Sequence, residues 1–232
     1  MNTLKFSTAN GKLQKLAKAL GIPKAHVYSF NMPSGYTCPN ADQCLSKADR
    51  VTGKITDGKN MKFRCFAASL ESTYPSARKR TWENFDSVKS AVKKNRLTET
   101  LQSVLPKNAK VIRIHASGDF YSKAYFEGFL QLAKDNPNLV FYGYTKMLDY
   151  VLADKPSNFR LVYSIGGKDD KRFVDTDVAY SKVIYDASQA DANIDIDDND
   201  IHAYNGVSSN LIIHGVQPRV VNQKIKSIRE LV

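Results

Sequence analysis

The sequence predicts one α/β domain built on a mostly parallel sheet, either an open sheet with flanking helices or a partial β/α-barrel. Three observations support this class. The 232 residues have the composition of a globular protein, with 42% hydrophobic and 25% charged residues. Their number is sufficient for one substantial core. The second half alternates short runs of β-branched and aromatic residues with segments of helical periodicity, which is the pattern of parallel strands joined by right-handed crossovers.

The first half of the chain predicts a helix, a strand and a polar excursion. Leucine and alanine recur at helical spacing over residues 11–20, and Gly21 and Pro23 end that helix. The run HVYSFNM at residues 26–32 predicts a strand. Residues 49–60 are rich in glycine, lysine and threonine, which favours a hairpin or a loop excursion.

Two more helices are expected before the middle of the chain. Residues 61–69 carry Cys65 and open the first of them. Asn84 or Asp86 is expected to cap the second, which then runs towards Leu105.

The second half is the more regular part. The expected strands cover residues 110–116, 139–145, 159–165 and 210–216. The expected helices cover residues 121–134, 148–153 and 176–187, and one more helix closes the chain. We therefore expect residues 1–232 to form one domain, with a basic half at 1–110 and a regular strand–helix half at 111–232.

Three of these strands end in groups of polar or glycine residues. The groups are His115/Ser117/Asp119, Tyr144/Thr145/Lys146 and Ser164/Gly166/Gly167. Chemistry in a parallel sheet gathers where strands end and loops begin. If the strands are neighbours, all three groups lie on one rim of the sheet. The loop that contains the first cysteines also follows an expected strand and is placed on the same rim.

The chain has three cysteines, Cys38, Cys44 and Cys65, and they lie in one 28-residue window. The run PSGYTCPNADQCL around the first two favours a loop. Grouped reduced thiols more often bind metals or act in catalysis than form disulfides. Their spacing matches neither paired zinc motifs nor ferredoxin motifs nor CxxxCxxC. Three thiolates can still hold a four-iron cluster or, with a histidine, zinc; ordinary packing is the alternative.

The segment RIHASGDF, residues 113–120, is the second candidate site. Alternation along a strand places Ile112 and Ile114 on one face, and Arg113 and His115 on the other. A histidine at the end of a strand can bind metal or transfer protons.

The residues that follow this histidine admit several roles. Asp119 can orient His115, accept a proton or cap the next helix, and Gly118 permits a tight turn. The structural alternative makes Asp119 or Ser122 a helix cap and His115 a hydrogen-bonded core residue. The candidate catalytic residues are therefore His115, Asp119 and Lys146.

Charge indicates an anionic partner or a solvated surface. The net charge is +11, and all of the positive excess lies in residues 1–110. Basic and aromatic residues interleave between Lys62 and Trp82, as they do where proteins follow phosphates and stack bases. Such runs are more often solvated faces, so nucleic acid or another anionic partner is an expectation only.

Two stretches taken together resemble the gene product 88 family of bacteriophage proteins. The first is PSGYTCPNA at 33–41 with Cys44 and Cys65, and the second is RIHASGDF followed by FYGYTK at 141–146. The resemblance runs from about residue 28 to 170. It extends distantly to phage proteins with radical-SAM-like cysteine sites and partial β/α barrels.

The resemblance implies a set of cofactor-binding residues. Cys38, Cys44 and Cys65 are implied as ligands of a cluster. The implied rim residues are His115, Ser117 and Asp119, with Gly118 between them. S-adenosylmethionine is a further cofactor of such sites, but the chain lacks the CxxxCxxC motif that would support it.

The expected function is therefore that of a phage iron–sulfur protein with one [4Fe–4S] cluster on three cysteines. The fourth iron position is left open or taken by a ligand other than cysteine, and the role is redox or radical-SAM-like. The first alternative is a zinc-stabilised nucleic-acid-binding protein. The second is a metal-free α/β enzyme with His115 and Asp119 as an acid–base pair. The sequence does not specify a substrate or a reaction.

No apolar run approaches the roughly 18–20 residues that span a bilayer. The first residues, MNTLKFSTANGK, lack the apolar stretch of a signal peptide. We therefore expect the cytoplasm, which the resemblance specifies as that of a phage-infected host cell, and no membrane partner.

Overall fold

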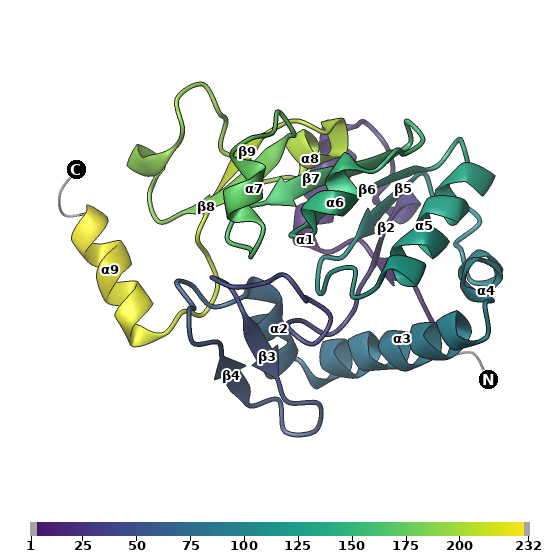
Figure 1. Cartoon of the computed structure of the whole chain (residues 1–232), viewed down its shortest axis with the longest axis horizontal. Coiled ribbons are helices and arrows are strands. Elements are labelled where there is room, and N and C mark those ends of the chain that lie inside the picture. Colours follow the sequence, from purple (N-terminus) through teal and green to yellow (C-terminus); the bar gives the residue numbers. More distant parts are fainter. Residues whose placement is uncertain (1–3, 230–232) are drawn as a thin grey trace.

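A computed structural model describes residues 4–229 and has a seven-stranded sheet at its centre (Figure 1). The strand order is β1-β2-β5-β6-β7-β8-β9, with β1–β2 antiparallel and every other pair parallel. The strands are β1 (Ser7–Thr8), β2 (Val27–Phe30), β5 (Val111–Ile114), β6 (Val140–Thr145), β7 (Phe159–Ser164), β8 (Tyr180–Ile184) and β9 (Ser209–Ile212). Within the described residues β1 and β9 are the two edges. The predicted α/β class is confirmed, as an open sheet rather than a closed barrel.

The parallel strands follow one another across the sheet in chain order, as they do in part of a β/α barrel. The helices are α1 (Gly11–Ala19), α2 (Phe66–Thr73), α3 (Pro75–Lys93), α4 (Leu97–Ser103), α5 (Lys123–Asp135), α6 (Leu148–Leu152), α7 (Asp170–Phe173), α8 (Ile201–Asn205) and α9 (Arg219–Arg229). Two 3₁₀ turns cover Lys24–His26 and Ala187–Gln189. No helix in the described part of the chain has the length and apolar character needed to cross a membrane.

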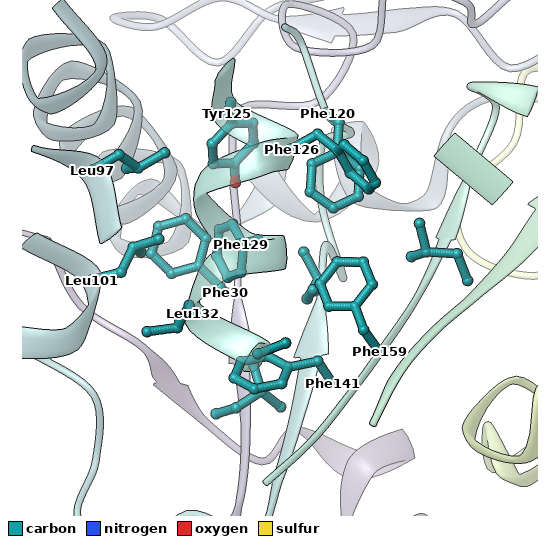
Figure 2. Close-up of a cluster of buried hydrophobic side chains, with 14 of the residues drawn as sticks. Phe30, Leu97, Leu101, Phe120, Tyr125, Phe126, Phe129, Leu132, Phe141 and Phe159 are labelled. Carbon is teal, nitrogen blue, oxygen red and sulfur yellow. The ribbon is translucent and has the colours of Figure 1, made fainter. Parts of the chain in front are cut away.

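The main core lies between the sheet and helices α3, α4, α5 and α6. Alternate strand residues such as Ile112, Ile114 and Phe141 face these helices and are fully buried. Figure 2 shows the aromatic part of this core, in which side chains of α5 lie among those of the strands and α4. The labelled residues are Phe30, Leu97, Leu101, Phe120, Tyr125, Phe126, Phe129, Leu132, Phe141 and Phe159.

A smaller core covers the opposite face of the sheet. Leu13 and Leu16 of α1 and Ala203 of α8 pack there against Tyr142 and Val162. These strand residues are the sequence neighbours of residues in the main core. Because successive side chains of a strand point to opposite faces of the sheet, each strand contributes alternate residues to the two cores.

The first part of the segment between β2 and β5, up to the start of α2, carries the cysteines and forms a lobe at one end of the strands. It contains the cysteine loop (31–45), a hairpin of β3 (Ser46–Ala48) and β4 (Ile55–Asp57), and the start of α2. Figure 1 shows β3, β4 and α2 close together beside the sheet. The excursion predicted at residues 49–60 is therefore the turn and second strand of a hairpin.

One expected helix is wrong. Residues 176–187 contain β8, which pairs in parallel with β7 and β9. Val183 and Ile184 are β-branched, and Tyr180 is aromatic, so these residues fit a pleated surface between two strands better than a helix. The pairing with strands distant in sequence outweighs the local helical spacing.

A second expected helix starts earlier and is divided in two. α3 begins at Pro75, whose missing N–H and fixed φ suit the first turn of a helix. Asn84 is buried within α3 and bonds to Lys5 and to the carbonyl of Asn31 instead of capping. Asn95, with a φ of 52°, separates α3 from α4.

Candidate functional site

All eight predicted site residues lie on the wall of one cavity of about 170 Å³, whereas Gly166 and Gly167, from the third strand-end group, do not. The cavity lies where β5, β6 and β7 end, beside Val183 of β8 and Leu211 of β9, under the cysteine loop and the first turn of α2. The predicted residues on its wall are Cys38, Cys44, Cys65, His115, Ser117, Gly118, Asp119 and Lys146. The strands concerned are neighbours, so the expectation that their ends share one rim is confirmed. The chemical role of each residue stays a prediction.

Cys38 lies in a loop that is held in place by hydrogen bonds between side chains and backbone groups of the loop itself. The Gly35 N–H donates to the Cys38 thiol, at 3.3 Å from Sγ. The Thr37 hydroxyl donates to the carbonyl of Pro33 at 2.8 Å, which closes the turn before the cysteine. An amide that points at sulfur stabilises a thiolate and a metal-bound thiolate alike.

Gly118 lets this loop approach the end of β5. Its φ is 86°, and a Cβ there would lie 2.6 Å from the Thr37 hydroxyl oxygen and 2.7 Å from the Cβ of Met32. The glycine that the sequence associated with a tight turn therefore also makes room for the cysteine loop.

Cys65 occupies the position just before α2. The amides of Ala67 and Ala68 face its thiol and lower its pKa, but burial and the neighbouring Cys44 have the larger effect and raise that pKa to about 12. The Cys65 N–H donates to the hydroxyl of Ser46 at 3.3 Å, so β3 also fixes this cysteine.

Burial also raises the pKa of Cys38, with Asp119 and the other two cysteines adding to the effect. The three cysteines are free and half-buried. They are close enough to disfavour one another's thiolate forms, and a positive ion among them would remove that penalty and displace the protons. Among residues 4–229, no three His, Cys, Asp or Glu side chains are placed to hold a single metal ion.

His115 does not follow the expected alternation. Its φ of 64° turns the chain out of β5, and the imidazole lies against Phe120 and Tyr125 on the α5 side, not with Arg113. Its Nε2 and the Tyr125 hydroxyl share a hydrogen bond of 2.8 Å. Nδ1 is buried and has no hydrogen-bond partner. Burial and the nearby Arg113 lower the pKa of His115 to about 3, so the ring is neutral.

Asp119 joins the ends of β5 and β6. One carboxylate oxygen accepts from the Thr145 hydroxyl and the Phe120 N–H, each at 2.7 Å, and the other accepts from the Lys146 N–H at 2.9 Å. Burial raises its pKa to about 6 against these bonds. The partner of the His115 ring is Tyr125 rather than Asp119, and Ser122 caps α5.

Lys146 bridges the ends of β6 and β7. Its ammonium donates to the carbonyls of Ser164 and Ile165 at 2.9 and 2.8 Å and to the Ser164 hydroxyl at 3.1 Å. The side chain is buried, so these three acceptors replace its water. This geometry gives Lys146 a structural task at the cavity wall.

Sequence reasoning missed one polar residue that supports the site. Glu71 of α2 is fully buried, and its Oε1 accepts from the Ser34 N–H at 3.0 Å and contacts the Ser117 hydroxyl. Glu71 thus joins α2, the cysteine loop and the end of β5. A glutamate in a helix is normally exposed, and its burial depends on which helix face packs inward, which the short run FAASLEST does not reveal.

Comparison with known proteins places the chain beside phage proteins. The profile of the family described as Gene product 88 matches residues 3–229. The chain is similar to the Gene 88 protein of Mycobacterium phage L5, with 22% identity over 160 residues, which are 64% of this chain and 57% of that protein. It thus spans little more than half of that relative's length. No solved structure matches the chain.

Proposed function

The chain belongs to the gene product 88 family of phage proteins, and we propose that it binds one [4Fe–4S] cluster through its three cysteines. Cys38, Cys44 and Cys65 would each bind one iron. The fourth iron position takes a ligand other than cysteine or stays open to a small molecule. The observation that carries this proposal is the shared cavity: all three thiols line it, although they come from a loop and a helix start up to 27 residues apart.

The arrangement of the thiols favours a cluster over a single zinc ion. Thiolates on one zinc lie about 2.3 Å from the metal and therefore converge on a point. Thiolates on a cubane cluster bind separate irons and stand around a volume. Cys38, Cys44 and Cys65 line a cavity, which corresponds to the arrangement around a cluster.

His115 is the better of two protein candidates for the fourth position. Both carboxylate oxygens of Asp119 already accept hydrogen bonds. The Nδ1 of His115 has no partner, while Tyr125 holds Nε2 and thus orients the ring. A neutral imidazole oriented through its other nitrogen is the form in which histidine binds metals.

Such a cluster would supply one-electron redox chemistry and, if one iron stays open, a position for a small ligand. The protein's own residues would hold and shield it. The Gly35 N–H and the first amides of α2 point at two of the sulfurs, and such hydrogen bonds to sulfur set the potential of a cluster. The redox or radical-SAM-like role, with S-adenosylmethionine as ligand, belongs to this proposal.

Anaerobic purification and reconstitution test the proposal. We expect a brown protein with about four irons and four sulfides per chain, the content of one cubane. Replacing Cys38, Cys44 or Cys65 singly by serine should lower the iron content. A protein that stays colourless and iron-free after reconstitution would overturn the proposal. Stoichiometric zinc, with salt-dependent affinity for DNA or RNA through the basic half, would favour the alternative.

A pair of histidine variants tests whether His115 is the fourth ligand of the cluster. His115→Gln should change the electron paramagnetic resonance signal or the reduction potential of the loaded cluster. His26→Gln is the matched control, because His26 lies just before β2 and is absent from the cavity wall. Identical spectra for both variants would exclude His115 and leave the fourth position to Asp119 or an exogenous ligand.

A further inference from the structure

A second cavity, of about 440 Å³, lies beside the cysteine cavity and shares Arg113 and Phe66 with it. We name it the basic cavity because Lys12, Arg113 and His214 line it. The rest of its wall is mainly apolar, with Phe66 and Leu70 of α2 among the residues. None of the described residues on this wall is Asp or Glu. Its volume is in the range of small-molecule sites.

The two cations on this wall are held in place by one buried carboxylate. Asp200 is fully buried, and its oxygens bind Lys12 at 2.8 Å and Arg113 at 2.5 Å. The hydroxyls of Tyr142 and Tyr144 donate to the same carboxylate at 3.0 and 3.1 Å. Four donors saturate its two oxygens, so Asp200 fixes the cations but offers no further acceptor.

Among the described residues, donors of both cations remain without a protein acceptor. The Nε of Arg113 is buried and unpartnered, and the Lys12 ammonium has three N–H groups, one of which binds Asp200. The next carboxylate, Asp197, lies beside His202 instead, with 3.7 Å between Oδ2 and Nδ1. Burial, Lys12 and Arg113 all lower the pKa of His214, so both cations act on this wall of the cavity. A buried donor without an acceptor is costly, so an anion on this wall is favoured.

We propose that the basic cavity binds a small organic anion, a carboxylate or a phosphate joined to an apolar or aromatic body. The anionic group would accept from Lys12 and from the guanidinium of Arg113, while the body would lie against Phe66 and Leu70. Binding does not require a cluster in the neighbouring cavity. It can therefore succeed or fail independently of the proposed iron–sulfur function.

Phenyl phosphate and benzoate are the probes, and benzyl alcohol is the neutral analogue. Calorimetry with the full chain as purified, and again after iron loading, should show saturable binding of at least one anion and at least tenfold weaker binding of the alcohol. Lys12→Gln should weaken anion binding at least tenfold. Lys15→Gln should change it less than twofold, because Lys15 lies on the same helix and pairs with the exposed Asp198 but does not line the cavity.

A second pair of variants tests the proposal even if Lys12→Gln does not fold. Leu70 is half-exposed and lines the cavity, so Leu70→Glu adds a carboxylate there with little cost to the fold. Leu70→Glu should abolish anion binding, and Leu70→Gln should retain it. The relative affinities of the two anions identify the anionic group. Any one of four results would overturn the proposal. They are no saturable binding at millimolar anion, equal binding of the alcohol, equal losses in Lys12→Gln and Lys15→Gln, and equal binding by Leu70→Glu and Leu70→Gln.

Discussion

The single proton of the Ser117 hydroxyl has two acceptors within reach. Its oxygen lies 2.7 Å from the carbonyl oxygen of Met32 and in short contact with Oε1 of Glu71. The Met32 carbonyl and an ionised Glu71 carboxylate can both only accept, so one hydroxyl proton serves two acceptors unless the Glu71 carboxyl carries a proton of its own. Burial raises the pKa of Glu71, against the hydrogen bonds from Ser117 and Ser34 that lower it.

The raised pKa of Glu71 makes stability depend on pH. Because the pKa of Glu71 is raised in the folded protein, folding retains a proton that the unfolded chain releases, and stability present at low pH is lost as pH rises through the raised pKa. Glu71→Gln should therefore flatten the fall of unfolding free energy between acidic and neutral pH, measured by urea denaturation at a series of pH values. Glu99→Gln, at an exposed position on α4, should leave that slope unchanged. An unchanged slope in Glu71→Gln would assign the pH dependence to other groups.

Gly118 permits a second test at the scale of one residue. Gly118→Ala adds a Cβ 2.6 Å from the Thr37 hydroxyl oxygen at a φ of 86°, so we expect a loss of about 3 kcal/mol from strain and overlap together. Gly206→Ala is the matched control, with a φ of 71° and nothing within 4 Å, and should lose only about 1 kcal/mol. Chemical denaturation measures both. Equal losses would mean that the cysteine loop yields to the added methyl group.

Residue types and strand ends were sufficient to find most of this site. The cysteines, His115 and Asp119 were predicted because thiols, imidazole and carboxylate follow expected strands, and neighbouring parallel strands bring such residues together. The side of the sheet on which His115 lies was not predictable, because it depends on a positive φ at a non-glycine residue. Glu71 was missed because its burial is a property of tertiary packing.

At the scale of secondary-structure elements, apolar periodicity in the sequence predicted an element correctly where it matched the face that the element buries. α1, α5 and β5 to β7 were found because their apolar periodicity matches the faces that they bury. β8 was mistaken for a helix because its identity depends on pairing with β7 and β9. The start of α3 at Pro75 was missed, although proline is common in the first turn of a helix.

The segment after β9 holds the start of α2 in place. The side chain of Gln217 accepts from the Arg64 N–H at 2.8 Å and donates to the carbonyl of Arg64 at 3.2 Å, directly before Cys65. Gln217→Ala leaves the Arg64 N–H without this acceptor, so we expect a loss of about 2 kcal/mol and faster amide hydrogen exchange around Cys65. Gln189→Ala removes a single bond, to the Tyr185 N–H, and is the control. Unchanged exchange around Cys65 would show that α2 and the Ser46 hydroxyl hold this cysteine without Gln217.

At the scale of the whole molecule, chain order decides where the site is. The parallel strands follow one another across the sheet, so every carboxyl end is on one edge, and the lobe inserted between β2 and β5 closes over that edge. The cysteines belong to the inserted lobe, while His115, Asp119 and Lys146 belong to the sheet. Whatever binds in the cavity therefore joins two parts of the fold, which also meet through an apolar cluster that includes Phe63 and Ile213 and through the polar contact between Glu71 and Ser117.

Cluster loading should consequently stabilise the entire fold rather than one loop. A ligand that binds only the folded state raises the free energy of unfolding, and each 1 kcal/mol raises the melting temperature of a chain of this size by about 2–4 °C. We expect the iron-loaded protein to melt at least about 5 °C above the iron-free protein in anaerobic calorimetry. The triple variant Cys38→Ser, Cys44→Ser and Cys65→Ser should fold and show no shift after the same treatment. Iron that is retained without any rise in melting temperature would mean that it binds outside the cavity, because binding within it links the lobe to the sheet.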